Sequence, residues 1–86
     1  MNDHWRVIDN CLIYTGLNFV AFVELVNKPN IVMWQVRITK GDGSEDKSVI
    51  INYYYTLGSA VQDVERFFDL SISEQREQFE MSSRVS

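Results

Sequence analysis

The chain contains one histidine, His4, and one cysteine, Cys11, the two side chains best suited to acid–base or nucleophilic chemistry. No nucleophile motif stands beside His4 near the start of the sequence, so the pattern favours a surface histidine. Cys11 alternates with apolar neighbours, which is typical of a small buried hydrophobe, and no second cysteine is present for a disulfide or a thiolate metal site. We therefore predict no catalytic residue, no metal site and no cofactor, and we expect the protein not to be an enzyme.

Three oxygen-bearing residues, Asp42, Ser44 and Asp46, have the spacing that begins a calcium-binding loop. Lys47 stands where that loop needs its glycine, and Tyr53 stands where it needs its final glutamate, so the match fails. Residues 40–47 (KGDGSEDK) instead have the composition of a hairpin loop, with Asp42-Gly43 as the expected turn.

Aromatic residues gather in Tyr53-Tyr54-Tyr55 and in Trp34, and such side chains stack on the bases of single-stranded nucleic acid. That kind of site also needs a basic groove, whereas the net charge here is −4 and the lysines and arginines are scattered among carboxylates. Packing inside the sheet is the favoured interpretation of these aromatics. A single-stranded nucleic-acid binder stays as an alternative.

Four segments have the β-branched and aromatic content of strands: Val7 to Tyr14, Leu17 to Val26, Ile31 to Thr39 and Ser48 to Tyr55. Between the second and third segments, Pro29-Asn30 provides a preset φ and a residue that tolerates positive φ, which indicates a tight turn.

Alternation along the last two segments predicts which side chains share a face of the sheet. In Ile31 to Thr39, we expect Val32, Trp34, Val36 and Ile38 to face the helical layer. In the returning strand, strict alternation places Val49, Ile51, Tyr53 and Tyr55 on one face and Ile50, Asn52 and Tyr54 on the other.

Helical signals begin after Gly58. Ser59 and Gln62 have the spacing of a capping box, and apolar residues recur every three or four positions as far as about Leu70: Ala60, Val61, Val64, Phe67 and Phe68. Ser71 and Glu74 repeat the capping spacing and indicate a second helix, in which the stretch from Glu74 to Met81 has only Phe79 and Met81 as apolar residues.

These elements predict one α+β domain that spans residues 1–86, with 82–86 as a flexible tail. We expect a small antiparallel sheet of about four strands, built as a meander of hairpins, followed by one or two C-terminal helices packed on one face.

A single short helix covers only one face of a sheet, yet the second strand segment is apolar on both faces. The tail helix, a second subunit or a partner protein would have to cover the remaining face. We expect this surface around Phe22 and Met33, with Gln35, Arg37 and Met33 as a mixed border.

The helical tail is the most acidic part of the chain, with six carboxylates against three arginines in residues 59–86: Asp63, Glu65, Asp69, Glu74, Glu77 and Glu80. A solvated helix surface explains this pattern. The alternative is an acidic face that steers the protein onto a basic partner, such as the nucleic-acid groove of another protein. On this hypothesis Asp69, Glu74, Glu77 and Glu80 contact the partner.

The general profile, a small acidic chain with aromatics but without a catalytic set, resembles that of small phage or mobile-element inhibitors, including anti-CRISPR proteins. The resemblance involves no specific motif. It implies a non-enzymatic protein-binding module that blocks or modulates a larger protein partner, and a homodimeric structural or interaction protein is the other alternative. We expect a cytoplasmic protein without direct nucleic-acid or membrane binding, because no apolar stretch approaches a membrane span and the single cysteine gives no support for an oxidising compartment.

Overall fold

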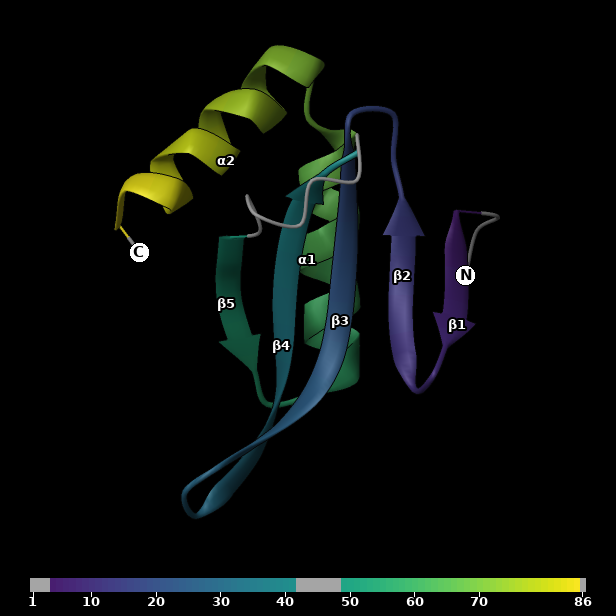
Figure 1. Ribbon diagram of the computed structural model, residues 1–86, viewed down its shortest axis with the longest axis vertical. Helices are drawn as coiled ribbons and strands as arrows, with labels where there is room; N and C mark the ends of the chain where they lie inside the picture. The colour runs from purple at the N-terminus through teal and green to yellow at the C-terminus, as the bar shows by residue number, and fades with distance from the viewer. Residues whose placement is uncertain (1–3, 42–48, 86) are drawn as a thin grey trace.

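In the computed structural model, which describes residues 4–41 and 49–85, an antiparallel sheet precedes two helices along the chain (Figure 1). The sheet has five strands in the order β1-β2-β3-β4-β5. Each strand therefore pairs with its neighbour in sequence, and this meander followed by helices confirms the predicted fold class.

The first hairpin divides the segment that we expected to be one strand, Val7 to Tyr14. It forms β1 (Trp5–Ile8) and β2 (Cys11–Thr15), which pair from Trp5 opposite Tyr14 to Ile8 opposite Cys11. Asp9 and Asn10 connect them with φ angles of 50° and 64°. Asp and Asn tolerate this left-handed conformation, and two such residues match the twist of a two-residue hairpin. The expectation of a single strand was wrong for this reason.

The central hairpin has the longest strands, β3 (Phe19–Lys28) and β4 (Ile31–Lys40). Lys28 pairs directly with Ile31, and Asn30 in the turn has a φ of 72°. The predicted Pro29-Asn30 turn is therefore confirmed. Because the loop contains only two residues, it fixes the register of the whole β3–β4 pair.

The last strand, β5 (Val49–Tyr54), contains an irregularity that strict alternation did not predict. Arg37 and Val36 are consecutive on β4, but they pair with Ile50 and Asn52, so Ile51 is the extra residue of a bulge. After the bulge, Tyr53 lies on the opposite face from Ile51, contrary to expectation. The predicted Asp42-Gly43 turn and the spacing of Asp42, Ser44 and Asp46 lie outside the described residues.

Helix α1 (Leu57–Asp69) begins earlier than the Ser59 capping box predicted. Thr56 is the N-cap, and its hydroxyl oxygen accepts a hydrogen bond of 3.2 Å from the backbone N–H of Ser59. The buried face of the helix carries three residues of the predicted apolar stripe, Ala60, Val64 and Phe67, while Val61 and Phe68 are partly buried.

Helix α2 (Ile72–Val85) begins with the predicted capping box. The Ser71 hydroxyl accepts from the Glu74 N–H at 3.3 Å and donates to the Glu74 carboxylate at 2.9 Å. Residues 82–85, expected as part of a flexible tail, lie in this helix. The buried Phe79 ring is 5.1 Å from the ring of Phe19 on β3.

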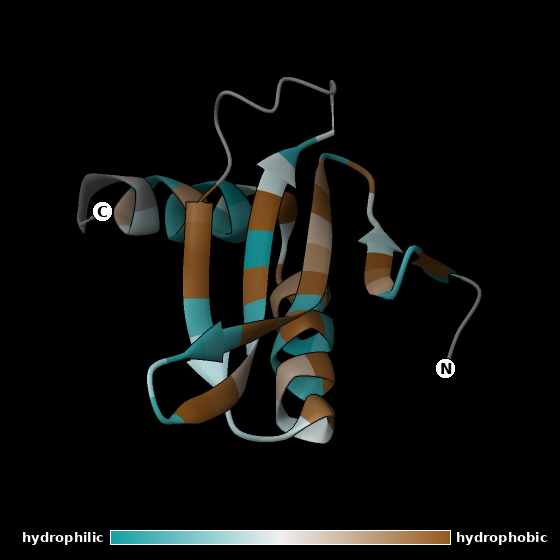
Figure 2. Cartoon of the chain, turned by 60° about the horizontal axis from the view of Figure 1, so that its bottom comes forward, coloured by the Kyte–Doolittle hydropathy of each residue, from teal (hydrophilic) through white to brown (hydrophobic). Residues whose placement is uncertain are grey.

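Both helices pack on the same side of the sheet. The Phe67 ring of α1 lies 5.8 Å from Phe19, the same β3 residue that contacts α2. Figure 2 shows α1 and α2 behind the strands, and it shows apolar and polar bands alternating along β4. Val36 and Ile38 on β4 are about 1% exposed, so they belong to the core as predicted, whereas Val32 is 50% exposed.

Candidate functional site

Among the described residues, no helix lies on the side of the sheet that faces away from α1 and α2 (Figures 1 and 2). We call this side the open face. Directly paired residues of antiparallel strands point to the same side. One row of such pairs therefore crosses all five strands on the open face: Arg6, Ile13, Phe22, Arg37 and Ile50.

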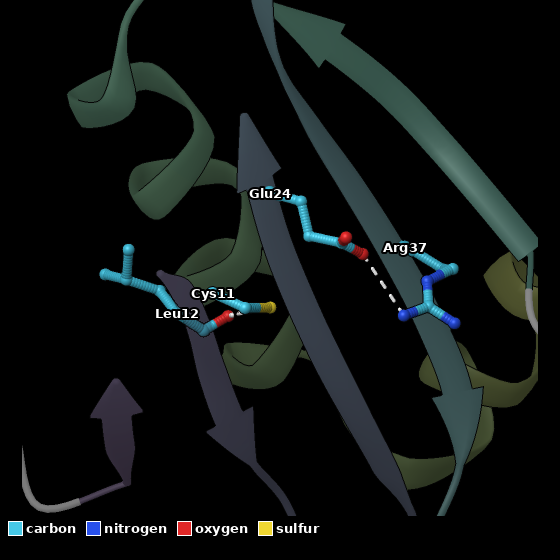
Figure 3. Close-up of polar contacts among 4 residues, drawn as sticks. All are labelled: Cys11, Leu12, Glu24 and Arg37. Atoms are coloured by element: carbon cyan, nitrogen blue, oxygen red, sulfur yellow. Dashed lines mark hydrogen bonds and ion pairs between the residues drawn. The ribbon is translucent and has the colours of Figure 1, made fainter. Parts of the chain in front are cut away.

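An ion pair lies at the centre of the open face (Figure 3). The Arg37 Nη2 atom of β4 donates to the Glu24 Oε1 atom of β3 at 3.1 Å, and both side chains are about one-third exposed. The Arg37 guanidinium carbon also lies 4.6 Å from the centre of the Phe22 ring. Exposed ion pairs contribute little to stability, but the flat guanidinium stacked on a ring is held in a defined position.

Around this centre, the open face is mainly apolar with a second cation on an aromatic ring. Val26 pairs with Met33, and Gln35 pairs with Tyr53. The Lys28 ammonium nitrogen lies 4.1 Å from the centre of the Tyr53 ring. The apolar groups here are half-buried or exposed, whereas Ala21, Val23, Val36 and Ile38 on the helix side of β3 and β4 are buried.

Cys11 lies beside this centre on β2, as Figure 3 shows. Burial raises the pKa of its thiol above the ordinary value of 9.0, Glu24 raises it further, and Arg37 opposes the shift. The thiol is therefore protonated at neutral pH, and a protonated thiol is a poor nucleophile and a poor metal ligand. The half-buried position agrees with the structural role that we expected for this residue.

The predicted partner-binding residues fall into two groups on opposite sides of the molecule. Phe22, Met33 and Gln35 lie together on the open face, as predicted. The four predicted carboxylates, Asp69, Glu74, Glu77 and Glu80, belong instead to the helical layer.

Three of the six helical carboxylates form contacts inside the protein. The Glu74 carboxylate accepts a hydrogen bond from the hydroxyl of the N-cap residue Ser71. Glu65 accepts a hydrogen bond of 3.3 Å from the Trp5 indole N–H, and Asp63 accepts hydrogen bonds from Tyr54 and Arg66. Asp69, Glu77 and Glu80 are exposed. Only these three therefore remain as candidates for contact with a partner.

Charge differs in sign between the two sides of the molecule. The open face carries three cations, Arg6, Lys28 and Arg37, and one carboxylate, Glu24. The helices carry six carboxylates and three arginines. An approaching charged protein therefore meets opposite fields on the two sides.

The four aromatic residues that suggested a base-stacking platform do not share a face. Trp34 pairs with Tyr54 on the helix side, where the Tyr54 hydroxyl donates a hydrogen bond to Asp63. Tyr53 lies on the open face, and Tyr55 follows the end of β5. The platform that the sequence suggested is therefore not assembled.

His4 also has a structural environment. Its ring stacks on Tyr14 at 5.1 Å, and its Nδ1 atom lies 3.2 Å from the carbonyl oxygen of Thr15. These contacts hold the exposed histidine at the start of β1.

A pocket of about 240 Å³ lies on the helix side, between β4, β5 and the two helices. Its wall includes Tyr54, Asp63 and Arg66, and Arg66 donates to Asp63 at 2.7 Å. Burial, and then the hydrogen bond to Asp63, raise the pKa of the Tyr54 hydroxyl. Tyr54 is therefore a neutral hydrogen-bond donor at physiological pH.

Within the described ranges, no group of three or more His, Cys, Asp or Glu side chains is arranged to hold a metal ion. A search of the same part of the chain finds no helix with the length and apolar content needed to cross a membrane. Comparison with protein-family models, with curated proteins and with solved structures found no match.

Sequence reasoning missed several residues of the open face. Glu24, Ile13 and Ile50 were not among the candidates, and Arg37 was expected only at the border of the surface. A signal for the contact between Arg37 and Phe22 was present, because a two-residue turn at Pro29-Asn30 places these two residues opposite each other by counting back from Lys28 and Ile31.

Proposed function

We propose that the protein is a small non-enzymatic protein-binding module that uses the open face as its docking surface. The observation that carries this proposal is the unequal coverage of the sheet, because both helices pack on one side while Phe22, Met33 and their neighbours stay partly exposed on the other. An apolar surface of this kind, rimmed by polar groups, is typical of a site that another protein covers.

The side chains at the centre favour protein over other ligands. Another protein can follow the twist of an exposed sheet face, whereas small molecules bind mainly in concave sites. Arg37 is stacked on Phe22 and paired with Glu24, so an aromatic, an arginine and a carboxylate meet in one place. Aromatic and arginine side chains are enriched among the residues that dominate binding energy at protein interfaces.

We further propose that the module acts by blocking or modulating a larger partner. Its exposed helical carboxylates, Asp69, Glu77 and Glu80, lie on the side away from the open face, so they would attract a basic surface of that partner to the helical side as a second contact. Such steering raises the association rate and weakens with salt, because the field of exposed charges is screened within about 10 Å at 0.1 M ionic strength.

Site-specific photo-crosslinking in the cells that produce the protein tests the docking surface. A photoreactive phenylalanine analogue replaces Ile50, which is 45% exposed on the open face, and in a matched variant it replaces Met81, which is 56% exposed on α2. We expect a defined protein adduct from position 50, lost when Phe22→Lys is added, and no equivalent Phe22-dependent adduct from position 81.

The mass of the adduct identifies the class of partner. An adduct at twice the mass of the 10.1 kDa chain indicates a second copy, and a heavier adduct indicates a larger protein. Equal adducts from both positions, or adducts that do not change with Phe22→Lys, would contradict the assignment of the open face.

A further inference from the structure

We infer that the protein chain that covers the open face is a second copy of this protein, packed face to face about a two-fold axis. This inference rests on the proposed function, because it requires the open face to bind protein. It goes further by naming the occupant. The resulting dimer has a central layer of two sheets with the helices of each copy on the outside.

The size of the face fits such a dimer. The strands contain 4, 5, 10, 10 and 6 residues. With strands about 4.8 Å apart and a rise of about 3.3 Å per residue, the projected area is roughly 550 Å², and side chains increase the accessible area. Stable interfaces bury roughly 600 to 1,000 Å² from each partner. One face therefore supplies nearly all the area that a dimer needs.

The charges at the centre are self-complementary. Glu24 and Arg37 have opposite signs and lie 3.1 Å apart at the middle of the face. When two copies of the face pack about a two-fold axis, Glu24 of each copy can pair with Arg37 of the other copy as well as with its own Arg37. Arg6 lies on the edge strand and Lys28 at the hairpin end, where their charges stay in the solvated rim.

The alternative head-to-tail arrangement is less favourable. It would bring the open face of one copy against the helices of the next, whose outer surface is largely charged and exposed around Asp69, Glu77 and Glu80. The positive open face and the negative helices would attract each other, but little apolar area would be buried. Such head-to-tail contacts would also continue from copy to copy without forming a closed assembly. Face-to-face packing buries Phe22 and Met33 on both copies and leaves the carboxylates facing solvent.

Sedimentation velocity of the full chain over a range from about 1 μM to 1 mM tests this inference. We expect a monomer–dimer equilibrium for the wild type. Phe22→Asp should raise the dissociation constant at least about thirty-fold, as removal of a central aromatic from an interface commonly does. Met81→Asp, which alters an exposed apolar residue on α2, should leave the constant unchanged.

A second variant guards against loss of folding in Phe22→Asp. Ile50→Lys lies at the exposed edge of the same face and should also weaken the dimer while keeping the circular dichroism spectrum of the wild type. A wild type that is monomeric at 1 mM would overturn the inference, and so would equal weakening by Met81→Asp. Neither result removes the proposed function, because a heavier Phe22-dependent adduct from position 50 would still show a different protein on the open face.

Discussion

Gln75 connects the two helices and gives the sharpest prediction about stability. Its side chain is 3% exposed, and its amide nitrogen donates to the carbonyl oxygens of Phe68 at 3.3 Å and of Leu70 at 3.0 Å. The Phe68 carbonyl is among the last four of α1, which have no partner within the helix. Gln75 therefore caps the end of α1 from the first turns of α2 and fixes the angle between the helices.

Gln75→Leu removes both hydrogen bonds while keeping most of the volume. Each bond is worth about 1 kcal/mol net, and the two carbonyls lose their donors. Part of this cost is recovered, because the Gln75 Oε1 atom is buried without a hydrogen-bond partner in the wild type. We therefore expect the free energy of unfolding to fall by about 2 to 3 kcal/mol, which lowers the melting temperature by roughly 10 to 20 °C for a domain of this size.

Urea denaturation followed by circular dichroism measures this change. Gln78→Leu, at an exposed position on the same helix, is the matched control and should change the free energy by less than about 0.5 kcal/mol. Gln75→Glu should be at least as destabilising as Gln75→Leu at pH 7, because the carboxylate cannot donate to the carbonyls. A Gln75→Leu variant as stable as the Gln78→Leu control would refute the assignment of Gln75 as the connection between the helices.

Three further predictions concern the turn, the helix surface and pH. Asn10→Gly should raise the free energy of unfolding by about 0.5 kcal/mol in thermal melts, because glycine adopts the φ of 64° without strain; a lower melting temperature would contradict the turn. The double variant Glu77→Lys and Glu80→Lys should leave the melting temperature nearly unchanged, whereas Glu74→Lys should cost about 1 kcal/mol, because it removes the carboxylate that accepts from the Ser71 hydroxyl and places a positive charge in the first turn of α2; equal losses would mean that the exposed pair is structural. Folding raises the pKa of Tyr54, so its contribution to stability is complete below pH 10 and decreases as pH rises further. In urea titrations, the wild type should therefore lose stability between pH 9.5 and 11 more steeply than Tyr54→Phe. Identical slopes for the two proteins would refute this prediction.

The element order could be predicted from the sequence because apolar alternation and capping residues are local signals. The errors occurred where one or two residues change the backbone. Asp9 and Asn10 form a complete turn inside an apolar segment, which divides one expected strand into two. The bulge at Ile51 reverses the alternation of β5, and period-two counting gives no sign of an inserted residue. Thr56 rather than Ser59 caps α1, because several hydroxyl residues compete within one short segment.

The open face was predicted only in part. Parity placed Phe22, Met33 and Gln35 on one surface, because they occur on the two long strands of a hairpin with a tight turn. The sequence left open which side α2 would cover, since that depends on the backbone at Leu70 and Ser71 and on the buried contact of Phe79 with Phe19. The grouping of the helical carboxylates as one surface was too broad, because internal hydrogen bonds to distant strands cannot be read from helical periodicity.

The central claim is that the open face is covered by protein, and the methionine methyl groups report on it directly. Met33 lies on the open face, and Met81 lies exposed on α2, outside the proposed interface. In a sample labelled with ¹³C at the methionine methyls, a soluble nitroxide broadens the signals of methyls that solvent reaches. As the protein concentration rises from about 20 μM to 1 mM, the broadening of Met33 should decrease while that of Met81 stays constant, since only Met33 enters the proposed dimer. Constant broadening of both methyl signals across this range would contradict the dimer. If the Met33 signal also stayed broadened when the partner identified by crosslinking is bound, the open face would not be the docking surface.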